Sequence, residues 1–100
     1  MIIETGTFEV WYRKEAGTLW TLLDGSGERE YRRQVHFQKT FNFMPDVMIS
    51  LSMFDIIHGS NHRVRVKAEN ITLTGFEVVF STWADTKVHG LGANWIAISP

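Results

Sequence analysis

The chain has 100 residues, of which 44% are hydrophobic and 21% charged, a balance typical of a single globular domain over 1–100. Ten Lys and Arg residues against eleven Asp and Glu residues give a net charge of −1, which favours neither a nucleic-acid partner nor an acidic membrane surface. The absence of cysteine excludes disulfides, thiolate metal sites and cysteine nucleophiles, and no apolar run approaches the roughly 20 residues of a membrane span.

Hydrophobic residues recur with a period of two along much of the chain, which is typical of strands with one buried face. Val35 and Phe37 alternate with polar residues, and Phe76, Val78 and Phe80 do so again later. In chain order, the strand-like runs are 35–38, 47–54, 63–68, 76–81 and 95–98. Turn sequences separate these runs at 24–27, 45–46, 59–61 and 74–75.

These five runs and the remaining length of chain make six or seven short strands with no sustained helical stripe, which predicts an all-β fold, an antiparallel β-sandwich or barrel. The run from Trp95 to Ile98 is apolar on both faces, so it needs cover from both sides, and a second subunit can supply one of them. We expect Trp11 and Trp20, like Trp95, to be mostly buried.

No constellation of catalytic residues emerges from the sequence. His58 and His62 are four residues apart, but Gly59 between them disfavours the helix that would bring both to one metal. A loop can still bring them together, but two surface histidines are the simpler interpretation. The acidic residues are scattered, whereas a glycosidase needs two carboxylates at one bond. No phosphate-binding, dinucleotide-binding or nucleophile-elbow motif is present. The sequence therefore predicts no enzyme, no metal site and no cofactor.

Sugar binding is a better-supported reading. An aromatic face packs against the apolar C–H patch of a sugar ring, and planar groups with paired donors suit adjacent hydroxyls. Trp83 is a candidate platform because it follows the alternating run 76–82 at a strand end, beside the turn at Ala84-Asp85. Arg63 is a candidate hydroxyl ligand. By residue type alone, Trp83 is more often a core or interface residue, and Arg63 more often a solvated strand residue.

The second half of the chain resembles the H-type lectin domain. The resemblance extends from about Gln34 to Ser99 and rests on four motifs, Arg63-x-x-x-x-Ala68, Thr74-Gly-Phe76, Thr82-Trp-x-Asp-Thr86 and Trp95-Ile-x-Ile98. It implies a β-sandwich of about six strands that assembles as a trimer or hexamer, with metal-free sites for galactose or N-acetylgalactosamine between subunits. An extracellular or cell-surface location is also implied, although residues 1–10 predict no signal peptide.

Position by position, Arg63 matches the family's sugar-binding arginine and Trp83 its aromatic platform. His89 stands where snail members of the family have a ligand-contacting tyrosine. Ser26 falls at the position of their key aspartate, and a shift in the loop lets Asp24 or Glu28 supply that carboxylate instead.

Ala84 and Ser26 depart from the snail pattern, which has histidine and aspartate at these positions. They leave open a second hypothesis, a trimeric structural or adhesion module, for example of a fibre or tail, that has lost sugar binding. Asp85 and Thr86 are expected to serve the turn and not the ligand.

Overall fold

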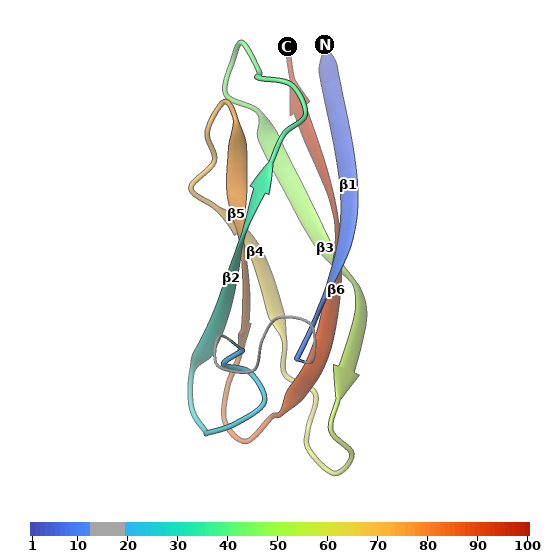
Figure 1. Cartoon of the computed structure of the whole chain (residues 1–100), viewed down its shortest axis with the longest axis vertical. Helices are drawn as coiled ribbons and strands as arrows, with labels where there is room; N and C mark the ends of the chain where they lie inside the picture. Colours follow the sequence, from blue (N-terminus) through green and yellow to red (C-terminus); the bar gives the residue numbers. More distant parts are fainter. Residues whose placement is uncertain (13–19) are drawn as a thin grey trace.

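The computed structural model describes residues 1–12 and 20–100 and confirms the all-β prediction. Its six strands are β1 (Ile2–Trp11), β2 (Arg29–His36), β3 (Asp46–Ile56), β4 (Arg65–Glu69), β5 (Gly75–Thr82) and β6 (Val88–Ser99). One antiparallel sheet has the order β1-β6-β3 and the other the order β2-β5-β4. The two sheets face each other as the layers of a β-sandwich, with both chain termini at the same end (Figure 1). Within the described ranges, no helix is long and apolar enough to cross a membrane.

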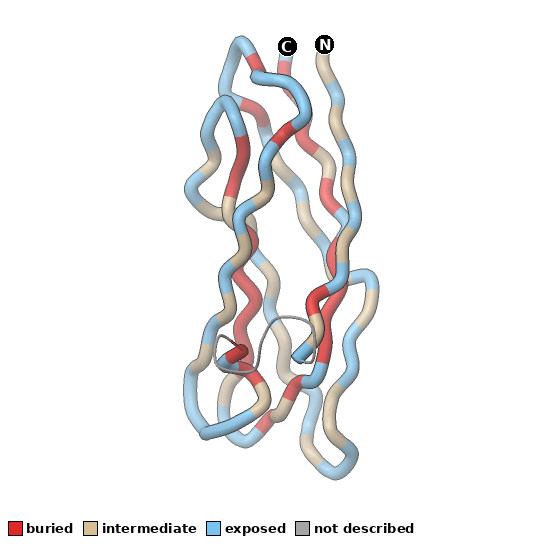
Figure 2. The backbone as a smooth tube through the Cα atoms, in the orientation of Figure 1, coloured by how far each residue is buried: buried red, intermediate tan, exposed pale blue. Residues whose placement is uncertain are grey.

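The core lies between the two central strands, β5 and β6, which carry most of the buried residues (Figure 2). The rings of Phe37, Phe76 and Trp95 pack with centroids 5.3 to 5.8 Å apart, which joins both sheets and the loop after β2. Trp95 also fills the space above Gly6, where a Cβ atom would lie 2.4 Å from the indole. The close approach of β1 to Trp95 therefore requires glycine at position 6.

The predictions for the tryptophans hold in part. Trp20 and Trp95 are buried, with 4% and 8% of their surfaces exposed, and the indole Nε1 of Trp20 donates to the carbonyl of Val88. Trp11 is less buried than these two and is partly buried, as Trp83 is. It ends β1 on the outer side of its sheet, where its ring packs over Gly90.

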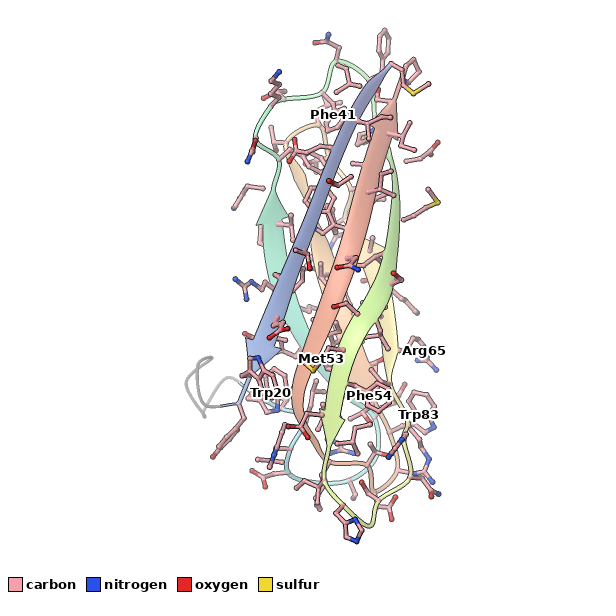
Figure 3. All side chains as sticks on the ribbon, turned by 90° about the vertical axis from the view of Figure 1, so that its right-hand side faces the viewer. Trp20, Phe41, Met53, Phe54, Arg65 and Trp83 are labelled. Carbon is pink, nitrogen blue, oxygen red and sulfur yellow. The ribbon has the colours of Figure 1, made fainter. Side chains whose placement is uncertain are left out.

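The two sheets differ in their outer faces. On the β1-β6-β3 sheet, Ile3 and Met48 are exposed by 54% and 58%. Ile98 of β6 pairs with Ile3, and Ile96 of β6 pairs with Met48. We call these four residues the apolar outer face; Figure 3 views this sheet from outside. A shallow hollow of about 310 Å³ adjoins them, lined by Met48, Ile49, Ser50, Asn94, Trp95 and Ile96.

The outer side of the β2-β5-β4 sheet is polar by contrast. Arg32 on β2 forms ion pairs with Glu30, Glu69 and Glu77, at 3.2, 3.2 and 2.7 Å. Hydrogen bonds from the guanidinium to these carboxylates raise the pKa of Arg32, so the group stays charged. A face of this kind is well solvated in water.

Candidate functional site

Trp83 lies directly after β5, on the side opposite to the core. Phe76, Val78 and Phe80 point into the sandwich, so the alternation of the strand places Trp83 outward, as the sequence predicts. The chain then reverses through Ala84, whose φ of 58° is in the left-handed region, and the amide of Thr86 donates to the carbonyl of Trp83 at 3.4 Å. The tight turn holds the indole at the end of the sandwich, partly exposed.

Arg63 reaches the same turn from the loop before β4. Its Nη1 donates to Asp85 Oδ1 at 2.7 Å and to Thr86 Oγ1 at 3.0 Å. The hydroxyl of Thr86, which is fully buried, in turn donates to the carbonyl of Asn61 at 2.7 Å. The structure thus brings Arg63 and Trp83 to one turn, and we call Arg63, Trp83, Asp85 and Thr86 the site cluster.

Asp85 and Thr86 lie in the turn, as predicted, but they also hold the guanidinium of Arg63. The hydrogen bond from Arg63 lowers the pKa of the Asp85 carboxyl, and the positive charge of Lys87 acts in the same direction. The carboxylate therefore stays ionised at neutral pH and keeps one end of the guanidinium in a fixed position.

This contact predicts a specific result in a pH titration. Followed by NMR, the Asp85 carboxyl should titrate below the ordinary value of about 3.9, and Arg63→Gln should move its midpoint back up. Because the folded pKa is the lower one, the stabilisation by this pair is present at neutral pH and is lost as the pH falls through the folded pKa. If Arg63→Gln leaves the titration midpoint of Asp85 unchanged, the hydrogen bond between Arg63 and Asp85 does not lower that pKa.

The loop that carries Asp24 and Ser26 is tied to the turn after Trp83. The guanidinium of Arg29 donates to the carbonyls of Asp24, at 3.1 Å, and of Ala84, at 3.0 Å. The amide of Gly27 also donates to the carbonyl of Ala84, at 2.9 Å. Asp24 and Ser26 are exposed, and in the described part of the chain no hydrogen bond reaches either side chain. The backbone of this loop therefore lies at the site, while the side chains of Asp24 and Ser26 face solvent.

His89 is not part of the same cluster within one chain. Asp55 pairs with Gly90 and Ile56 with Val88, so His89 is the extra residue at a bulge in β6. Such a bulge redirects a side chain, and His89 is exposed. Among the described residues, no contact joins His89 to Arg63 or Trp83.

Sequence reasoning missed Arg65, whose guanidinium carbon lies 4.8 Å from the centroid of the Trp83 ring. It also missed Phe54, which is 50% exposed and packs edge-on against His62 at 5.3 Å. Figure 3 draws Phe54, Arg65 and Trp83 at the same end of the sandwich. A spacing of two between Arg63 and Arg65 is the only signal in the sequence that could have indicated the second arginine.

Neither His58 nor His62 belongs to a metal-binding group. Within residues 1–12 and 20–100, no set of three His, Asp or Glu side chains lies close enough to hold an ion. The polar groups of the site cluster are a guanidinium, one carboxylate and one hydroxyl beside a partly exposed indole. These groups are suited to binding a polyhydroxylated ring and supply no pair of carboxylates for hydrolysis.

The comparison with known families and proteins agrees with this chemistry. A model of the H-type lectin domain matches residues 32–98, which include Arg63, Trp83 and His89. A protein of Fuscovulum blasticum named "ATP synthase subunits region ORF 7" is 45% identical over 84 residues, which cover 84% of this chain and 70% of that protein.

Discoidins of Dictyostelium discoideum are similar in both sequence and structure. Discoidin-2 is 35% identical over 80 residues, which cover 78% of this chain and 31% of that protein. The solved structure of wild-type discoidin II superimposes with a TM-score of 0.84 at 28% identity, over 98% of this chain and 36% of that one. This chain thus spans about a third of the length of the discoidins that it matches.

Proposed function

Because this chain belongs to the H-type lectin family, we propose that it binds glycans ending in galactose or N-acetylgalactosamine and catalyses no reaction on them. The observation that carries this proposal is the site cluster, in which Asp85 and Thr86 hold the Arg63 guanidinium beside the partly exposed indole of Trp83. A sugar ring can stack on the indole while the remaining guanidinium donors bind its hydroxyl or acetamido oxygens.

The proposed binding site lies between subunits of a trimer or hexamer. Two features support this. The apolar outer face exposes Ile3 and Met48 beside Ile96 and Ile98, which favours its burial against neighbouring copies. His89 is separate from Arg63 and Trp83 within one chain, so a neighbouring subunit is the natural source of a third side chain at the ligand.

A trimeric structural or adhesion module without sugar binding is the competing proposal. Ser26 and Ala84 favour it, because the first provides no carboxylate and the second no ring. In that case the hydrogen bond between Arg63 and Asp85 serves only to stabilise the turn.

Titration calorimetry with free monosaccharide separates the two proposals. We expect galactose and N-acetylgalactosamine to bind with a dissociation constant between about 1 μM and 1 mM, that is, with roughly 8 to 4 kcal/mol. Glucose, which differs from galactose in the configuration of one hydroxyl, serves as the control sugar. No heat with either galacto-configured sugar at millimolar concentration would favour the structural module.

A further inference from the structure

Arg65 is the charged side chain that contacts the aromatic platform. Residue 65 pairs with Ser81 across β4 and β5, so Arg65 and Trp83 are neighbours on the outer side of that sheet. The guanidinium lies over one face of the indole, 4.8 Å from the ring centroid, and the side chain is 46% exposed. A ring that stacks on this face must first move the guanidinium aside.

Arg65 has no firm ionic partner among the described residues. Its one carboxylate contact is with Glu28 at 3.7 Å, and the Glu28 side chain is 67% exposed. An exposed pair at this distance contributes little, and water screens it. Arg63, by contrast, holds Asp85 at 2.7 Å. Arg65 is therefore the guanidinium at this site that can turn to a new partner at small cost.

Two guanidinium groups near the platform, those of Arg29 and Arg65, have no close carboxylate partner among the described residues. The nearby carboxylates of Asp85 and Glu30 are already paired, with Arg63 and Arg32. The guanidinium of Arg29 binds main-chain carbonyls and no carboxylate among the described residues, so its charge is not neutralised by direct contact. Guanidinium groups without a close carboxylate attract an anion more than a neutral ligand.

The geometry points to a ligand that is a galacto-configured ring with an anionic substituent, a carboxylate or a sulfate, and to Arg65 as the residue that selects it. This inference rests on the proposed function, since it names the class of sugar for the same site. A neutral sugar that displaces the guanidinium from Trp83 ends the cation–π contact and offers the guanidinium only neutral hydroxyl oxygens in its place. An anionic sugar returns a charge-assisted hydrogen bond to the displaced guanidinium.

Arg65→Gln should therefore change the two affinities in opposite directions. Galactose should bind about two- to fivefold tighter to the variant, since the exposed cation–π contact no longer competes for the indole. Galacturonic acid, galactose 3-sulfate and galactose 6-sulfate place the anion differently, and at least one should bind wild-type protein about tenfold tighter than galactose at low salt. Arg65→Gln should remove that preference, as measured by calorimetry with the free sugars.

Lys67→Gln is the matched control, because Lys67 lies two residues further along β4, is exposed, and carries the same charge. If the control removes the preference as fully as Arg65→Gln, a general charge effect explains it and the assignment to Arg65 is overturned. Galactose binding without preference for any of the three acids overturns this inference and leaves the proposed function standing. Absence of binding by all four sugars overturns both. A preference for galacturonic acid would identify the anionic group as a carboxylate, and a preference for either sulfated galactose would identify it as a sulfate.

Discussion

Trp83→Ala is expected to abolish detectable binding of free galactose or N-acetylgalactosamine by the intact oligomer. Removing a stacked aromatic typically costs on the order of 1–3 kcal/mol, which is roughly a 5- to 150-fold loss of affinity. A site with only about 4 to 8 kcal/mol to begin with then falls to the edge of what calorimetry detects. The fold should tolerate this change, because Trp83 points away from the core.

The assay has to measure binding of free monosaccharide to single sites. Linked sites raise avidity by about 10²–10⁴ without any new contact, so cell agglutination can hide the loss at a single site. Phe43→Ala is the matched control, because Phe43 is an aromatic residue with 63% exposure in the loop at the opposite end of the sandwich (Figure 1). Unchanged affinity in Trp83→Ala at a preserved melting temperature would move the platform elsewhere, with Trp11 as the next candidate.

The sequence predicts the sandwich well because most strands have one clearly apolar face. Phe76 to Phe80 alternates cleanly, and the structure buries that side. β1 was not among the predicted runs, because two of its inward positions do not look like core. Gly6 faces inward to make room for Trp95, and the carboxylate of Glu4 accepts hydrogen bonds from the amide of Gln38. Both roles depend on residues far away in the sequence.

The site could be predicted only where one residue matches one position of a family pattern. Arg63 and Trp83 were predicted as site residues in this way, and the structure places them at the same turn. The contact of Arg65 with Trp83 depends on the register between β4 and β5, and the position of His89 on an extra residue in β6. Neither register nor bulge can be derived from alternation alone, because a bulge adds a residue without changing the residue types.

The wild-type chain should form trimers or hexamers, with a mass three or six times the 11.5 kDa of one chain in light scattering. The reason is the apolar outer face, where Ile96 lies in register between Thr5 of β1 and Met48 of β3. Ile96→Asp should convert the oligomer to monomer, because burying an unpaired carboxylate at a subunit interface costs several kcal/mol. In the free monomer the same side chain reaches water from the sheet surface, so the strand itself should still form.

His36→Asp tests whether any new carboxylate on a strand has the same effect. His36 is exposed at the end of β2, in the sheet whose outer side is polar, so this variant should keep the wild-type mass. If sites lie between subunits, the monomeric Ile96→Asp variant should lose sugar binding although Arg63, Asp85 and Trp83 are all retained. Full affinity in that monomer would show that one chain holds the whole site and that His89 of a neighbouring subunit contributes nothing to it.

A monomeric mass for the wild-type chain at micromolar concentration would contradict the predicted oligomer. The apolar outer face would then need a different partner.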